Sequence, residues 1–271
     1  NLRVATSASS VSQLQKFLES SLESINNARA VPPPPPVVFT FTGQGSFYEG
    51  IGRQLFMEFS FYRDQVLKLD HLVQIFGFPS VIPAIEGTLA AAESSPLVTQ
   101  LTIVVTEIAL TRLWGLLGVQ PNAVIGHSLG EYAALVAAGV ISAADAIYLV
   151  GKRAELTLAT CQTGSHSMLA VRASVDKIKE IDSSDAYEVS CMNGPNDTVI
   201  SGPVKDLETT RSKLESSGLK CTPLDVPFAF HTAQMIPMLE SFEQAAKHVT
   251  FKTPTIPIIS PLLGNCVFDG K

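Results

Sequence analysis

The stretch VIGHSLGEYAALVAAG, residues 124–139, places a serine between an apolar run and an alanine-rich segment. Its centre, GHSLG, has the pattern Gly-x-Ser-x-Gly, in which the glycines permit a tight turn and the serine hydroxyl projects from its apex. The preceding residues, PNAVIG, predict a short strand, and the alanines that follow predict a helix. The stretch therefore predicts a strand-turn-helix unit that presents Ser128 as a candidate nucleophile.

Other segments repeat this alternation of strand and helix. VVFTFTG at 37–43 predicts a buried strand of β-branched and aromatic residues, and TPTIPIISPLL at 253–263 predicts a strand with prolines at its edges. Residues 96–118 predict a long apolar helix, and residues 142–161 predict another that Ser142 caps. The succession predicts an α/β fold with an α/β-hydrolase-like core, in which helices cover a parallel sheet.

Residues 165–226 have a different pattern. They predict a strand, a helix, a hairpin with the turn signal Gly-Pro-Asn-Asp at 194–197, a second helix and a last strand. The order βαββαβ is typical of a ferredoxin-like unit. We therefore expect a small ferredoxin-like subdomain, residues 165–226, inserted into a core made of residues 37–164 and 227–271. We expect that core to be truncated at its C-terminal end.

Residues 1–36 predict a linker. Apolar residues at helical spacing predict a helix over residues 8–30. Residues 32–36 are five consecutive prolines. Proline fixes φ and lacks an amide hydrogen, so this run predicts a stiff polyproline II strut leading into the core. A ligand segment for an SH3-type domain is the alternative.

The bulk composition limits the class of function. Of 271 residues, 46% are hydrophobic and 16% are charged, which is enough apolar material for a compact core. A net charge of -6, with no cluster among the 19 basic residues, argues against nucleic-acid binding. No apolar run reaches the ~18–20 residues of a membrane span, and the sequence has no signal-peptide pattern. We therefore expect a cytoplasmic protein without membrane contact.

The cysteines predict no metal site. They lie far apart and none belongs to a CxxC pair, the spacing typical of structural zinc sites. We expect four reduced, buried thiols. These are Cys161, Cys191, Cys221 and Cys266.

A nucleophilic serine needs a general base, and histidine is the usual one. His231, in PFAFHTAQM, occupies a turn into a helix and has apolar neighbours. From its position alone it is the favoured base, with a buried core histidine as the alternative. No acidic residue stands at a spacing that nominates a third member of a triad. The other histidines are His71, His127, His166 and His248.

Five motifs follow one another along the chain: FTGQG (41–45), GHSLGEYAAL (126–135), GKRAEL (151–156), NGPNDTVISG (193–202) and FAFH (228–231). Together they resemble the acyl-carrier-protein acyltransferases, in particular the malonyl-CoA acyltransferase domain of a polyketide synthase or fatty acid synthase. The resemblance covers about residues 37–263. FGFPSVIPAIEG at 76–87 most resembles the iterative, non-reducing polyketide synthases of fungi. Residues 1–36 then resemble part of the linker that follows a ketosynthase.

The resemblance implies roles for the reacting residues. Ser128 would carry the acyl group as an ester, and His231 would accept its proton and then serve acid and base roles in the second transfer. A backbone carbonyl around residues 260–261, rather than an acid, would orient His231. The backbone N–H groups of Gln44 and Leu129 would form the oxyanion hole.

The resemblance also implies a substrate. Arg153 would bind the free carboxylate of malonate through two parallel hydrogen bonds, although a structural salt bridge is the alternative for such an arginine. Phe230 and the side chain of Leu129 would line the acyl pocket and disfavour methylmalonyl. His127 and Asn193 would complete the substrate-binding residues.

The implied reaction moves malonyl from malonyl-CoA to the phosphopantetheine thiol of an acyl carrier protein. It requires no metal or bound cofactor, because a thioester is already activated. The expected partners are that carrier protein and the ketosynthase and other domains of the same multidomain chain. Two alternatives remain: a lipase-like or patatin-like serine hydrolase, and a non-catalytic docking module.

Overall fold

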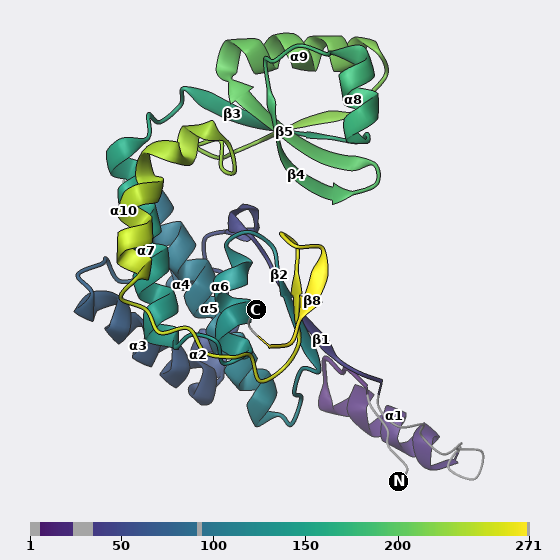
Figure 1. The fold of residues 1–271 in the computed structure, drawn as a ribbon. Coiled ribbons are helices and arrows are strands. Elements are labelled where there is room, and N and C mark those ends of the chain that lie inside the picture. The colour runs from purple at the N-terminus through teal and green to yellow at the C-terminus, as the bar shows by residue number, and fades with distance from the viewer. Residues whose placement is uncertain (1–5, 24–34, 91–93, 270–271) are drawn as a thin grey trace. The chain divides into compact units, whose positions relative to one another are not determined.

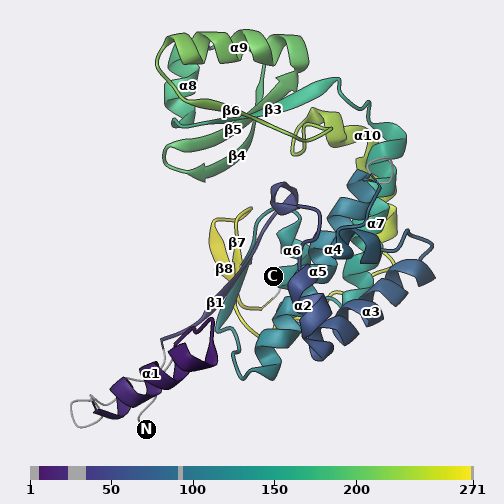
Figure 2. The same ribbon diagram turned by 180° about the vertical axis from the view of Figure 1, so that it is seen from behind.

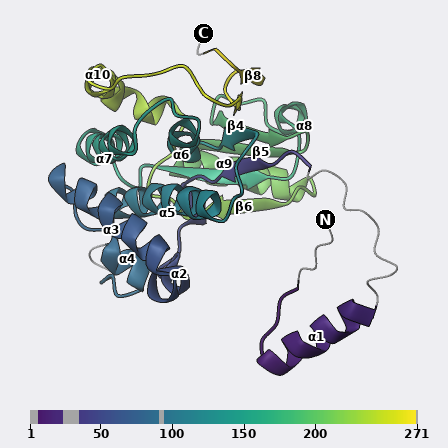
Figure 3. The ribbon, with the colours of Figure 1, turned by 90° about the horizontal axis from the view of Figure 1, so that it is seen from below.

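The computed structural model describes residues 6–23, 35–90 and 94–269. The chain divides into two compact units, Asn1–Val37 and Val38–Lys271. The first unit contains helix α1, Val11–Glu23 (Figure 3). The rest of the predicted helix, residues 24–30, and most of the predicted polyproline strut lie outside the described residues.

Within the second unit, the first sheet has the strand order β1-β2-β7-β8. β1, β2 and β7 are parallel, with Phe41 paired to Gly126 and Val124 paired to Ile258. β8 runs antiparallel to β7 and forms a hairpin that the sequence did not predict, because its three residues have no apolar alternation. The strands are β1 (Val38–Phe41), β2 (Ala123–Gly126), β7 (Ile258–Ser260) and β8 (Asn265–Val267).

Helices pack beside this sheet, with α3, α5 and α7 in mutual contact (Figures 1, 2 and 3). Ser142 caps α7 as predicted: its side chain accepts from the backbone N–H of Asp145, whose carboxylate in turn accepts from Ser142. The helices are α2 (Arg53–Glu58), α3 (Ser60–Ile75), α4 (Ile82–Glu86), α5 (Pro96–Leu116), α6 (Gly130–Ala137) and α7 (Ala143–Thr160).

Helix α5 is the one helix among the described residues that is long and apolar enough to cross a membrane. The expectation that no apolar stretch reaches this length was therefore wrong. In the fold, 61% of its most apolar window is buried. Leu101, Ile103 and Val104 have no exposed surface. The helix is apolar all round because it runs through the core.

The second sheet has the order β4-β5-β3-β6, and all of its neighbouring strands are antiparallel. Helices α8 and α9 lie on one side of it (Figure 1). Buried Leu169, Ile200 and Leu214 contribute to a core separate from that of the first sheet. This is the ferredoxin-like topology. Its elements are β3 (His166–Val171), α8 (Val175–Ile181), β4 (Glu188–Gly194), β5 (Asp197–Pro203), α9 (Val204–Ser216) and β6 (Cys221–Leu224).

After β6 the chain returns to the first part of the unit. A 3-10 turn, η4 (Ala233–Met235), leads into α10 (Ile236–Ala246), which packs on α7. All four cysteines are free thiols. Cys161 is buried but Cys266 is exposed, so the expectation of four buried thiols was wrong. Among the described residues, no cluster of three or more His, Cys, Asp or Glu side chains could hold a metal ion.

Candidate active site

Ser128 occupies the turn between β2 and α6, with φ at 53°. This left-handed conformation is uncommon for a residue with a side chain and persists only where the surroundings enforce it. The flanking glycines provide that enforcement. A Cβ at Gly126 would overlap the backbone of Glu131, and a Cβ at Gly130 would overlap the Phe41 carbonyl. The glycines of the motif therefore allow the strand, the turn and the helix to meet.

The Ser128 Oγ lies 2.7 Å from the Nε2 atom of His231. His231 also has a positive φ, 63°, and follows Phe228 and Ala229, which are fully buried. Burial lowers the pKa of His231, and the nearby Arg153 and His127 lower it further. The imidazole is therefore neutral at physiological pH and can accept a proton.

The carbonyl predicted to orient His231 belongs to residues 260–261, where β7 ends. The Ser260 carbonyl accepts the backbone N–H of Gly264 at 2.9 Å, as part of the β7–β8 turn. Among the hydrogen bonds of the described residues, none joins the His231 ring to this segment.

The two predicted oxyanion donors lie at helix starts. Gln44 begins the 3-10 turn η2 (Gln44–Ser46) beside the cavity, and Leu129 is the N-cap residue of α6. Backbone N–H groups in a first helical turn have no intrahelical acceptor and point outward. The Leu129 side chain is only 1% exposed and packs in the core. The expected role of this side chain in the acyl pocket stays a prediction.

Arg153 reaches the site from α7. Its Nη1 donates to Gln100 Oε1 at 2.6 Å, and its guanidinium lies 5.1 Å from the centre of the Phe230 ring. Burial lowers its pKa, which the nearby Tyr132 partly offsets. No carboxylate forms an ion pair with Arg153 in the described part of the chain. The predicted alternative, a structural salt bridge, is thus absent there.

Gln100 is a site residue that the sequence analysis missed. It is fully buried on α5, and its Nε2 donates to Gln44 Oε1 at 3.1 Å. One amide therefore connects the guanidinium of Arg153 to the side chain of Gln44. The available signal was a primary amide in the second turn of an otherwise apolar helix, which requires buried hydrogen-bond partners.

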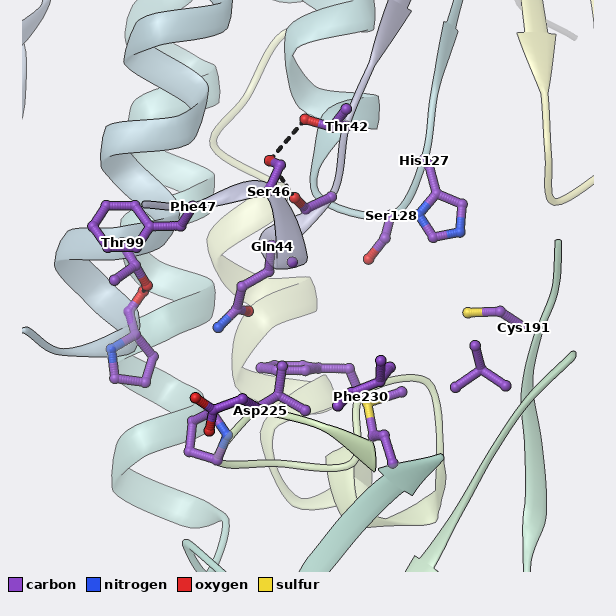
Figure 4. Close-up of a pocket in the computed structure, with 18 of the residues that line it drawn as sticks. Thr42, Gln44, Ser46, Phe47, Thr99, His127, Ser128, Cys191, Asp225 and Phe230 are labelled. Carbon is purple, nitrogen blue, oxygen red and sulfur yellow. Dashed lines mark hydrogen bonds between the residues drawn. The ribbon is translucent and has the colours of Figure 1, made fainter. Parts of the chain in front are cut away.

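A cavity of about 960 Å³ opens at Ser128, between the two sheets (Figure 4). His127 and Asn193 lie on its wall, with His127 Nε2 3.0 Å from Asn193 Oδ1. That contact joins the turn between β2 and α6 to strand β4 of the second sheet. Its lining also includes Gln44, Phe230 and His231, and three residues to which the sequence analysis gave no role in a site: Thr42, Cys191 and Asp225.

A second cavity, of about 310 Å³, contacts the same serine and histidine. Arg153 lines this cavity together with Glu131 and with apolar and aromatic side chains such as Tyr132 and Phe242. Ser128 and His231 therefore lie where a large open cavity meets a smaller one that contains the guanidinium. A bound molecule could extend from one to the other past the serine hydroxyl.

Comparisons with known proteins agree with this geometry. The family described as "Acyl transferase domain" matches residues 38–266. The non-reducing polyketide synthase nscA of Neosartorya fischeri is 54% identical over 281 residues, which span the whole of this chain and 16% of the synthase. The chain thus spans about a sixth of the length of that curated relative.

Solved structures give the same result. The acyltransferase domain from the second module of the salinomycin polyketide synthase has a TM-score of 0.80 and 30% identity, covering 97% of this chain and 63% of that one. The malonyl CoA-acyl carrier protein transacylase of Clostridium perfringens has a TM-score of 0.76 and 26% identity, covering 86% and 74%. These comparisons support neither the hydrolase nor the docking-module alternative. They confirm the resemblance read from the five motifs: the chain belongs to the acyl transferase domain family.

Proposed function

We propose that the chain transfers malonyl from malonyl-CoA to the phosphopantetheine thiol of an acyl carrier protein, within a non-reducing polyketide synthase. The placement of Arg153 is the observation that supports malonyl as the acyl group. Its guanidinium faces a cavity beside Ser128 without a carboxylate partner among the described residues. A planar guanidinium that stays charged matches the free carboxylate of malonate.

The reaction proceeds in two steps. Ser128 Oγ attacks the thioester carbon while His231 Nε2 takes the hydroxyl proton, and the thiol of coenzyme A leaves with that proton. The carrier's thiol then gives its proton to His231 and attacks the ester carbon, the bond from that carbon to Ser128 Oγ breaks, and His231 returns the proton to Oγ. In both steps the backbone N–H groups of Gln44 and Leu129 stabilise the oxyanion. Phe230 limits the space beside the α-carbon, and His127 and Asn193 contact the substrate in the larger cavity.

The remaining assignments are part of the same proposal. The core comprises residues 37–164 and 227–271, the subdomain comprises 165–226, and residues 1–36 link to a ketosynthase. The carrier protein and the neighbouring catalytic domains are the partners, and the location is cytoplasmic. The name of the Clostridium perfringens transacylase supports the carrier protein as acceptor. No cofactor is needed beyond the phosphopantetheine of the carrier.

The test separates transfer from hydrolysis. The protein is incubated with malonyl-CoA, and intact mass spectrometry looks for a malonyl adduct on Ser128. Carrier protein in its phosphopantetheine form is then added, and malonyl-carrier is compared with free malonate. We expect the adduct and predominant transfer. Predominant free malonate in the presence of carrier would contradict the proposal, as would the absence of an adduct.

A further inference from the structure

One peptide group connects helix α5 to the serine turn. Its carbonyl, from Phe41, accepts the backbone N–H of His127 at 2.9 Å. Its N–H, from Thr42, donates to Glu107 Oε1 at 2.7 Å. A carboxylate on α5 is thus linked through a single peptide to the residue that precedes Ser128. Hydrogen bonds arranged in series polarise one another, so each end of this chain strengthens the other.

The same carboxylate oxygen also organises the turn that contains Gln44. The Thr42 hydroxyl lies 3.1 Å from Glu107 Oε1 and 2.8 Å from Ser46 Oγ. Ser46 Oγ in turn donates to the Gly43 carbonyl at 2.9 Å (Figure 4). These contacts close the loop on both sides of Gln44. Its backbone direction therefore depends on where Glu107 holds Thr42.

Two side chains of α5 hold this loop. Gln100 binds the Gln44 side chain, and Glu107, seven residues later on the same face of the helix, binds Thr42. Seven residues are about two helical turns, so both side chains point toward η2. The helix is therefore a rigid support for the loop.

The burial of the Glu107 side chain lowers the stability of the fold. Its Oε2 is buried, and among the described residues it has no hydrogen-bond partner. Burial raises the pKa of this carboxyl to about 7, against the opposing effect of the two Thr42 hydrogen bonds. A buried polar atom without a partner lowers stability. An apolar residue would avoid that loss but could not hold the Thr42 amide.

We propose that Glu107 is a positioning residue for acyl transfer: by binding the Phe41–Thr42 peptide, it sets the Gln44 amide and the Ser128 turn relative to each other. This inference rests on the proposed function, in which the Gln44 amide stabilises the oxyanion that forms when Ser128 attacks. Glu107 itself does not touch the substrate. Its effect falls on the rate of the chemical step and leaves binding of the malonyl carboxylate at Arg153 unchanged.

The test uses Glu107→Met, Glu107→Gln and a matched control, Thr111→Ala. Methionine keeps the length and helix preference of glutamate but cannot accept a hydrogen bond, whereas glutamine keeps the acceptor. Thr111 lies one turn further along α5, and its hydroxyl binds only the Glu107 backbone carbonyl. Thr42→Val, at an exposed side chain, removes the hydroxyl contacts of Thr42 and keeps its backbone N–H. This variant replaces Glu107→Met in the test if Glu107→Met does not fold.

We expect Glu107→Met to lower kcat for malonyl transfer by about 10–100-fold, with KM for malonyl-CoA unchanged, since small displacements of reacting groups cost rates of this order. Glu107→Gln should restore most of the lost kcat, and Thr111→Ala should match wild type. Thr42→Val should lower kcat less than Glu107→Met, again without a change in KM.

A wild-type kcat in Glu107→Met, or in Thr42→Val if Glu107→Met does not fold, would overturn the inference. A loss that Glu107→Gln does not restore would also overturn it. Labelling of Ser128 by a fluorophosphonate is measured in parallel, because it needs the same turn and oxyanion donors but no malonyl group. If wild type fails to transfer malonyl yet labelling slows in Glu107→Met, the proposed substrate is wrong and the positioning role stands. If wild type transfers malonyl, and wild type and Glu107→Met are labelled at equal rates, the positioning role of Glu107 is wrong and the proposed function stands.

Discussion

Ser128 and His231 both have left-handed backbone conformations, with φ at 53° and 63°, and their side chains meet at 2.7 Å. The two residues lie 103 positions apart in the chain. Each non-glycine residue in this conformation costs about 1–3 kcal/mol, so two of them in one contact point to a site built for reaction. The first prediction concerns this pair.

Replacing Ser128 by alanine removes the nucleophile and should abolish the malonyl adduct. Replacing His231 by alanine leaves the hydroxyl without a base and should slow adduct formation by about 10²–10⁴-fold. Both rates are measured by quenched intact mass spectrometry with malonyl-CoA. An adduct of undiminished yield on the Ser128→Ala protein would place the acyl group on another residue.

Arg153 should determine the preference for a carboxylated acyl group. Its guanidinium is held by Gln100 and Phe230, neither of which is an anion. Arg153→Ala should raise acetyl loading relative to malonyl loading, because the attraction to the free carboxylate is lost. Competing loading from an equimolar mixture of acetyl-CoA and malonyl-CoA gives the ratio directly. An unchanged ratio would remove Arg153 from the acyl site.

On the acid side, kcat/KM should begin to fall at a lower pH than it would with a histidine of ordinary pKa. Burial, Arg153 and His127 all lower the pKa of His231, so the imidazole stays neutral as the pH falls through its usual 6.5. The profile of kcat/KM against pH should therefore remain flat to below pH 6.5. In Arg153→Ala the limb should move upward, since one positive neighbour is gone. A wild-type limb above pH 6.5 would contradict a neutral buried base.

Gly130 should tolerate no side chain. A Cβ there would overlap the Phe41 carbonyl, which also accepts from His127. Gly130→Ala should destabilise the fold by about 1–3 kcal/mol and reduce acyl transfer further, because the overlap distorts the serine turn itself. Urea unfolding and transfer rates check both effects. The control is Gly45→Ala, where a Cβ meets no atom within 4 Å; wild-type behaviour in both variants would contradict the steric argument.

Glu107 should make the stability depend on pH. Its pKa is raised to about 7 from 4.5, so the folded state holds the proton more tightly than the unfolded state does. The contribution to the free energy of unfolding is greatest below pH 4.5 and decreases as the pH rises to about 7, by at most on the order of 3 kcal/mol. Glu107→Gln should remove this decrease. Urea unfolding of wild type and of Glu107→Gln is measured at pH 5 and pH 8. The same change in unfolding free energy in both proteins would contradict this role of Glu107.

The serine turn could be predicted from the sequence because its requirements are local. The bonds and overlaps that involve Gly126, Ser128 and Glu131 lie within six residues of one another. The ferredoxin-like order could also be predicted, since alternating apolar positions and turn residues mark each element in succession. The five motifs then identified the family, which the comparisons confirm.

Contacts between distant elements could not be predicted in this way. Gln100 and Arg153 lie 53 positions apart and belong to different helices, and Glu107 and Thr42 lie 65 positions apart. No periodicity links such pairs, because each depends on how two helices and a loop pack in three dimensions. The same reason explains why the burial of the Leu129 side chain in the core was not evident from the sequence.

The amino-acid sequence by itself determined most of the elements, the serine turn and the family, because helix periods, glycine turns and ordered motifs act over short distances. Only the tertiary structure decided which side chains complete the site. Packing brings Gln100 within hydrogen-bond distance of Arg153 and Gln44. It also brings Glu107 to the Phe41–Thr42 peptide, which contacts the serine turn. Buried polar groups must find hydrogen-bond partners, and which partners are within reach is settled only when the helices pack.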